Sequence, residues 1–154
     1  MKTVRALGLD VGEKRIGLAV GDTSTALAVP VGAVTRDGSP SDLQGVLDQA
    51  SLRDVGTLVV GMPLSLNGRM GPQAQVVAAF VEELNSRTCL PVVTWDERYT
   101  SVEADRLLRE ARGQGRGKRS RPPEGAQDAV AATVMLQAYL DSQRLHQHPS
   151  AGPR

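Results

Sequence analysis

The sequence predicts a single α/β domain built on a five-stranded mixed sheet, in which three antiparallel strands precede parallel strands and helices cover both faces. Three short apolar segments come first, joined by connections too short to hold a helix. Beyond residue 40 the apolar period changes, and helical segments alternate with short apolar runs, as parallel crossovers require. Sheets of this kind place their functional sites at the carboxyl ends of the parallel strands.

The first three strands are expected at residues 4–10, 16–20 and 26–34. Gly12 to Arg15 form a connector of hairpin length, so the first two strands should pair antiparallel in the centre of the sheet. The third run contains Pro30, which has no backbone N–H to donate to a ladder. We therefore expect the third strand at the edge of the sheet or at a bulge.

Two helix-then-strand units follow. Ser41 can cap a helix, and residues 57–60 form a compact apolar strand after it. A loop rich in Gly and Pro occupies residues 61–72, and then come a second helix around residues 76–84 and a fifth strand at residues 91–95. The apolar positions with helical spacing are Leu43, Val46, Leu47 and Ala50 in the first helix and Val76, Val77, Phe80, Val81 and Leu84 in the second.

The remaining chain holds two helices separated by a basic segment. Thr100 and Glu103 form a capping box for a helix through Leu108, and residues 126–140 form an Ala-rich final helix. Residues 112–125 between them carry five basic side chains among glycines, which predicts a mobile basic loop. No periodicity follows Ser142, so we expect a folded domain at residues 1–142 and a disordered tail at residues 143–154.

Composition narrows the class of protein. A length of 154 residues suits one domain, and a net charge of +1 neither indicates nor excludes a nucleic-acid partner. The aromatic content of 3% makes base stacking a minor resource, and the single Cys89 excludes an intrachain disulfide, a cysteine zinc cluster and a redox CxxC pair. No apolar run approaches the roughly 20 residues of a membrane span, and Asp10 interrupts the N-terminal stretch too early for a signal peptide. We expect a cytoplasmic protein with no membrane partner.

Asp10 is the first candidate for chemistry. It ends the first strand, directly before a turn, after a run apolar enough to be central in the sheet. An aspartate at such a position often caps the turn by accepting backbone amides, and this alternative stays open. A catalytic role is favoured because other acids are expected at the same edge of the sheet.

Asp96 and Glu97 follow the fifth strand in the same way. Side chains alternate across a strand, so only one of the two should face Asp10, and we select Glu97 for its longer reach. If the fifth strand lies two places from the first, the backbones are roughly 10 Å apart, which two inward carboxylates can span around metal ions. The alternative is that these acids pair with Arg98 or favour the next helix N-terminus.

Asp128 opens the Ala-rich final helix among small apolar neighbours. Acids are common at helix starts because the dipole stabilises them by about 0.3–1 kcal/mol. The alanines beside it nevertheless suit a helix packed closely against the sheet, where a buried acid needs a cation. Both histidines, His146 and His148, fall in the expected tail, and we do not expect them to be catalytic.

Three carboxylates without a His or Cys cluster suit Mg²⁺ or Mn²⁺ rather than zinc. Two such ions about 3.5–4 Å apart would activate water and clamp an in-line phosphodiester displacement. The sequence therefore predicts Asp10, Glu97 and Asp128 as both catalytic residues and metal ligands. Basic residues near them could hold phosphates without reading sequence. These candidates are Lys14, Arg15, Arg69, Arg98, Arg116, Lys118, Arg119 and Arg121.

Four ordered motifs resemble the YqgF family, also called RuvX-like, which is related to Holliday junction resolvases. The motifs are LGLDVG at residues 7–12 with RIGLA at 15–19, VVGMPL at 59–64 with Gly68 and Gly71-Pro72, DERYTS at 96–101, and DAVAA at 128–132. The resemblance covers most of the chain. It implies a ribonuclease H-like fold and a bacterial cytoplasmic nuclease in which Asp10, Glu97 and Asp128 are the acidic set. It also implies a role in maturing the 5′ end of 16S rRNA, with pre-rRNA and ribosomal particles as partners.

Three alternatives are weighed against this interpretation. An actin-like ATPase shares a similar phosphate hairpin around Asp10 and Arg15, but 154 residues leave no room for its second subdomain. A catalytically silent RNA- or ribosome-binding module would keep the carboxylates for structure and bind through the basic loop. A Holliday junction resolvase is the nearest enzyme alternative, and because junction cleavage needs paired sites it favours a homodimer over a monomer. RNA or DNA preference and endonuclease or exonuclease mode stay open.

Overall fold

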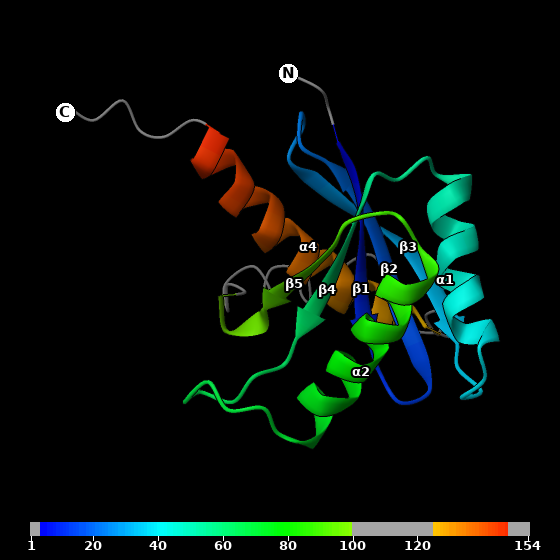
Figure 1. Ribbon diagram of the computed structural model, residues 1–154. Helices are drawn as coiled ribbons and strands as arrows, with labels where there is room; N and C mark the ends of the chain where they lie inside the picture. Colours follow the sequence, from blue (N-terminus) through cyan, green and yellow to red (C-terminus); the bar gives the residue numbers. More distant parts are fainter. Residues whose placement is uncertain (1–3, 100–124, 148–154) are drawn as a thin grey trace, which may run out of the picture.

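The computed structural model describes residues 4–99 and 125–147, and its elements follow the expected order (Figure 1). The strands are β1 (Arg5–Val11), β2 (Arg15–Asp22), β3 (Leu27–Thr35), β4 (Thr57–Met62) and β5 (Val92–Asp96). The helices are α1 (Ser41–Leu52), α2 (Pro72–Arg87), the short 3-10 helix η1 (Glu97–Tyr99) and α4 (Ala126–Gln147). The helix predicted after Thr100 and the predicted basic loop, apart from its last residue Gly125, lie outside the described residues.

The strands form one sheet in the order β3-β2-β1-β4-β5. β2 pairs antiparallel with both β1 and β3, whereas β4 pairs parallel with both β1 and β5. The predicted mixed sheet is therefore confirmed. The fifth strand lies two places from the first, which was the condition for Asp10 and Glu97 to approach each other across the sheet.

The edge position of β3 confirms the interpretation of Pro30. Leu18 of β2 pairs with Gly32, but the next residue, Ala19, pairs with Pro30, so Val31 is an extra residue in a β-bulge. The bulge breaks the ladder where Pro30 has no N–H to donate. Gly32 has a φ of 144°, which side-chain-bearing residues rarely adopt, and so it completes the bulge.

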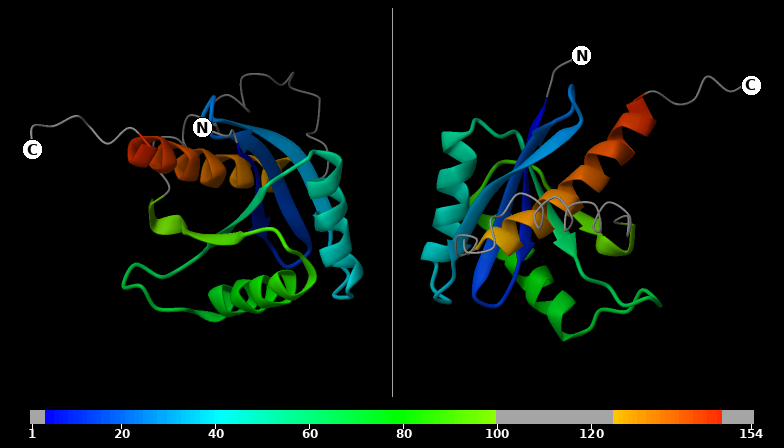
Figure 2. Two further views of the ribbon diagram at one scale, coloured as in Figure 1. Left: turned by 45° about the horizontal axis from the view of Figure 1, so that its top comes forward. Right: turned by 180° about the vertical axis from the view of Figure 1, so that it is seen from behind.

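Helices cover both faces of the sheet, as predicted (Figure 2). The alternation of side chains along β1 sends Leu7, Leu9 and Val11 to one core, which α1 and α2 cover. The opposite face of the same strand carries the small Ala6, which packs in the α4 core. The α1 and α2 residues of the first core include Leu43, Val46, Phe80 and Leu84, and the α4 residues of the second are Ala132, Met135, Leu136 and Leu140.

α4 approaches the sheet closely because the strands present glycines to it. A Cβ on Gly8 of β1 would lie 2.9 Å from Cβ of Leu136, and one on Gly21 of β2 would lie 2.7 Å from Cδ1 of Leu140. Ala129 and Ala132 are buried on the helix side. This contact confirms that the small residues of the final helix serve close packing.

α4 differs from its prediction at its end. It continues to Gln147, so residues 143–147 are helical and do not belong to a tail that begins after Ser142. The sequence contains no Gly or Pro between residues 126 and 147 that would end the helix earlier. The first such residue is Pro149, which disfavours a helical conformation at the residue before it. Within the described ranges, every helix is too short or too polar to cross a membrane.

Candidate functional site

The candidate acids lie at the carboxyl ends of the central strands. Asp10 is near the end of β1, Glu97 directly follows β5, and Asp128 is in the first turn of α4. β4 lies between β1 and β5. Leu9 of β1 pairs with Val60 of β4, so the next residues, Asp10 and Gly61, lie side by side. On the other side, Asp10 pairs directly with Gly17 of β2. Asp10 is therefore flanked in the sheet by two glycines.

Gly17 makes room for the start of α4. A Cβ on Gly17 would lie 2.0 Å from the carbonyl oxygen and 2.3 Å from the carbonyl carbon of Asp128. Paired residues of an antiparallel ladder point to the same face, so the Asp10 side chain lies on the face that α4 covers. The first turn of α4 is thereby seated beside Asp10, and the charge of Asp128 contributes to raising the pKa of Asp10.

Gly61 makes room for Glu97 on that same face. A Cβ on Gly61 would lie 2.7 Å from Oε1 of Glu97 and 3.2 Å from Cγ of Met135 on α4. The Glu97 carboxylate therefore lies over Gly61 of β4, the strand between β5 and β1. Gly17 and Gly61 both belong to motifs found in the sequence, but their role in making room for the acids was not predicted. The only signal in the sequence was the position of each glycine near the end of a predicted strand.

Burial and mutual repulsion make the acids hard to ionise together. The pKa of Glu97 is raised to about 7, first by burial and then by the charges of Asp10 and Asp96. The pKa of Asp10 is also raised, chiefly by burial and secondarily by Asp128. Asp10 thus interacts with two other acids, Asp128 and Glu97, and like charges so close together oppose one another's ionisation.

Arg15 supplies a cation to Asp128. Its Nε donates to Oδ2 of Asp128 at 2.8 Å, and both side chains are about one-third exposed or less. Arg15 was predicted to contact phosphate, and the structure instead pairs it with one of the candidate acids. Its place at the start of β2, next to the β1–β2 turn, brings it to the N-terminus of α4.

Asp96 forms an ion pair with Arg98, which the sequence analysis gave as the alternative to a catalytic role. Its carboxylate accepts hydrogen bonds from Nε of Arg98 at 2.9 and 3.0 Å and from Nη2 at 2.5 Å, and these contacts lower its pKa. Arg98 also donates to the carbonyl of Leu66 in the β4–α2 loop at 3.3 Å. The pairing of Asp96 with Arg98 was the alternative to a catalytic role, so the structure separates the two neighbouring acids.

The other predicted phosphate contacts are placed differently. Lys14 is exposed on the β1–β2 turn, and Arg69 is exposed in the β4–α2 loop. The structure does not bring these two into the group formed by the acids. The four basic loop residues Arg116, Lys118, Arg119 and Arg121 lie outside the described residues.

The donor set fits a hard divalent cation by its chemistry. All three candidate ligands offer carboxylate oxygens, and two of them, Asp10 and Glu97, have pKa values raised by burial and then by neighbouring negative charge. Among residues 4–99 and 125–147, however, no three His, Cys, Asp or Glu side chains are grouped closely enough to hold a metal ion. The structure brings the acids together in pairs, Asp10 with Asp128 and Asp10 with Glu97, rather than as one ligand shell.

Comparisons with known proteins show a family match over most of the chain. A family model described as "RuvX: Holliday junction resolvase" matches residues 4–142. A protein of Caldanaerobacter subterraneus named "Putative pre-16S rRNA nuclease" is 40% identical over 92% of this chain and 99% of its own length. One with the same name from Crocosphaera subtropica is 40% identical over 94% of this chain and 97% of its own length.

Solved structures share the fold. The structure described as "T. thermophilus RuvC in complex with Holliday junction substrate" superposes with a TM-score of 0.55 and 16% identity, over 92% of this chain and 97% of that one. At this identity the likeness concerns the fold alone, and it confirms the ribonuclease H-like arrangement expected from the sequence.

Proposed function

Since this chain belongs to the RuvX family, we propose that it is a nuclease that hydrolyses phosphodiester bonds with Asp10, Glu97 and Asp128 as its acidic set. The observation that carries the proposal is the pair of glycines on either side of Asp10. Gly17 admits the start of α4 with Asp128, and Gly61 admits the carboxylate of Glu97, both on the same face as Asp10. A protein that needed these acids only for turns or caps would have no reason to crowd them.

The three carboxylates would hold Mg²⁺ or Mn²⁺. When bound, a pair of such ions supplies an activated water and stabilises the leaving 3′ oxygen of an in-line displacement. Arg15 orients Asp128 through its bond to Oδ2. We expect the exposed Lys14 and Arg69 to bind phosphates of the nucleic acid without reading its sequence.

The substrate we propose is the 5′ extension of precursor 16S rRNA in the cytoplasm. Support comes from the relatives that carry the name of a pre-16S rRNA nuclease and match this chain over nearly their whole length. Ribosomal particles are then the natural partners, because 16S rRNA is itself a component of the ribosome.

A second candidate function is cleavage of four-way DNA junctions. The description of the matching family as Holliday junction resolvases favours it. Cutting a junction symmetrically requires two active sites in one particle, so this function predicts a homodimer, whereas end processing of rRNA is compatible with a monomer. Sedimentation of the purified protein in the presence of a junction tests this candidate, because a strictly monomeric protein would count against junction cleavage.

The test is cleavage by purified protein in Mg²⁺, Mn²⁺ or EDTA. The substrates are single-stranded RNA, single-stranded DNA, a four-way junction and precursor 16S rRNA in ribosomal particles. We expect cleavage that needs a divalent ion and disappears in Asp10→Asn. Asp48→Asn on the surface of α1 is the matched control, because it removes an exposed acid whose carboxylate bonds to Gln44 of the same helix.

Two outcomes would overturn the proposal. Equal cleavage by Asp10→Asn and the wild type would remove Asp10 from the site. Tight binding to RNA without cleavage of any substrate, with or without ribosomal particles, would identify a silent binding module instead.

A further inference from the structure

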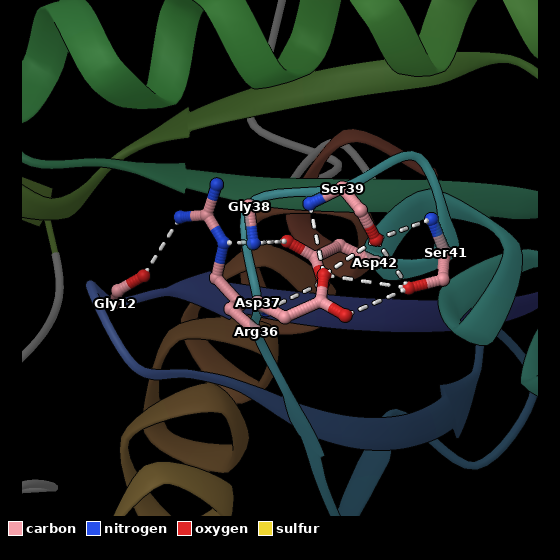
Figure 3. A network of polar contacts seen from close by, with 7 residues as sticks. All are labelled: Gly12, Arg36, Asp37, Gly38, Ser39, Ser41 and Asp42. Carbon is pink, nitrogen blue, oxygen red and sulfur yellow. Dashed lines mark hydrogen bonds and ion pairs between the residues drawn. The ribbon is translucent and has the colours of Figure 1, made fainter.

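A second polar network contacts the β1–β2 turn. It joins the turn to the end of β3 and the start of α1 through Arg36 and Asp42 (Figure 3). Asp42 is 4% exposed, and its carboxylate approaches Nε of Arg36 at 3.4 Å. Neither residue belongs to the acidic set, and neither was a candidate from the sequence.

Arg36 holds the turn at two points. Its backbone N–H donates to the carbonyl of Lys14 at 2.8 Å, and its Nη1 donates to the carbonyl of Gly12 at 2.8 Å. The turn closes on itself through the amide of Gly12, which donates to the carbonyl of Arg15 at 2.9 Å. Arg36 therefore bonds to the carbonyls on both sides of the exposed part of the turn.

Asp42 holds Arg36 in place. Besides the ion pair, its two carboxylate oxygens accept the backbone amides of Asp37 and Gly38 at 3.0 and 3.1 Å. The guanidinium of Arg36 also lies over the ring of Phe80 on α2, 5.5 Å from its centroid. A buried acid with two amide donors is rigid, so the arginine is fixed between α1, α2 and the turn.

The turn so held carries a predicted phosphate contact, Lys14, and the ion-pair partner of Asp128, Arg15. Lys14 is exposed at its tip, and Arg15 follows it and bonds to Asp128. We propose that Arg36 and Asp42 are positioning residues that set the β1–β2 turn, so that Lys14 meets a substrate phosphate and Arg15 meets Asp128. This inference rests on the proposed nuclease function for its consequence, but the clamp itself is testable without cleavage.

Two other roles are open to Arg36, and they predict different results. If Arg36 contacted phosphate itself, its effect on binding would add to that of Lys14. If the network only stabilised the fold, its loss would lower the temperature of unfolding without a specific effect on phosphate binding. A double-mutant cycle between Arg36 and Lys14 separates these roles, because coupled residues are not additive.

The binding experiment uses a fluorescein-labelled single-stranded RNA in EDTA, so that no cleavage occurs. The dissociation constant is measured over a range of salt for Lys14→Gln, Arg36→Gln and the double variant. We expect each single change to reduce the slope of log K against log salt by about one, the loss of one phosphate contact. The double variant should show the same reduction as either single variant. A reduction of about two would show that Arg36 contacts phosphate directly and would overturn the proposal.

For Asp42→Asn, charge alone and a positioning role predict opposite changes in RNA affinity. Removing a negative charge should strengthen RNA binding if electrostatics alone decides, because fewer acids oppose the phosphates. A positioning role predicts weaker binding and a shallower salt slope, as in Arg36→Gln. Arg36→Lys should also resemble Arg36→Gln, because one ammonium cannot repeat the two contacts of the guanidinium. Wild-type binding by Arg36→Lys or tighter binding by Asp42→Asn would contradict the clamp.

Amide hydrogen exchange tests the clamp on the protein alone. In Arg36→Gln and Asp42→Asn we expect loss of protection at the amide of Gly12, with protection of the central strands retained. Arg5→Gln is the matched control, because Arg5 also donates to a carbonyl, that of Arg53 at 2.7 Å, but at the other end of β1. Unchanged exchange at Gly12 would refute the clamp, whereas altered exchange in a protein that binds no RNA would refute only the proposed function.

Discussion

Substitution of Gly17 by alanine is the most direct test of how the acidic site is assembled. The added Cβ would be placed 2.0 Å from the carbonyl oxygen of Asp128, whereas real Cβ contacts below 3.0 Å essentially never occur. The obstacle is main chain at the start of a helix, which cannot rotate away as a side chain can. The first turn of α4 must therefore move by about 1 Å or more, away from the partner strand of Asp10.

The size of the effect follows from this displacement. Inserting a methyl group into a packed contact costs about 1–3 kcal/mol in the free energy of unfolding. In a domain of this size that lowers Tm by about 2–4 °C for each kcal/mol. A misplacement of about 1 Å in a catalytic group can reduce the rate about 100-fold. We therefore expect Gly17→Ala to stay folded at room temperature but to lose most of its cleavage activity.

The assay is single-turnover cleavage together with thermal unfolding. Gly56→Ala is the matched control, because its added Cβ would meet only ordinary contacts at 3.5 and 3.9 Å, before β4 and far from the acids. We expect the control to keep its activity and stability. If Gly17→Ala cleaves and unfolds like Gly56→Ala, then α4 is not seated on Gly17 and the proposed site geometry is wrong.

Three further changes test the electrostatics of the site. Gly61→Ala should lower cleavage with little loss of Tm, because the nearest atom is the flexible end of Glu97 at 2.7 Å, and a large drop in Tm would contradict this. The folded pKa of Glu97 is raised to about 7 from 4.5, so stability in EDTA should fall as pH rises between these values. Glu97→Gln should make that fall shallower and raise the free energy of unfolding by about 1–2 kcal/mol at pH 8. The gain is partial because solvent screens the half-buried carboxylate. Urea unfolding measures it, and the same pH dependence in the variant and the wild type would refute the prediction. Mn²⁺ at about 100 times its Kd should raise the free energy of unfolding by about 2.7 kcal/mol in the wild type but not in Asp10→Asn, and equal gains would place the ion elsewhere.

The sheet and its helices were predictable because they depend on local patterns. The change from alternating strands to helix-strand units predicts the mixed sheet, and Pro30 predicts the bulged edge strand, since a missing N–H is a property of one residue. The prediction that only one of Asp96 and Glu97 faces Asp10 also followed from a local rule, the alternation of side chains along a strand, and Glu97 was selected for its longer reach. The catalytic assignment of Asp10, Glu97 and Asp128 stays a prediction.

The tertiary structure decided which charges meet and how closely elements pack. Arg15 and Asp128 are far apart in the sequence, and only the seating of α4 on β2 brings them to 2.8 Å. The same holds for Arg36, whose bonds to the β1–β2 turn depend on the register of β3 with β2. The sequence by itself determined the elements, their order and the strand ends that carry acids, because these depend on neighbouring residues along the chain. Partners of charged side chains and the need for glycine under a helix depend on distances across the fold, which no local pattern contains.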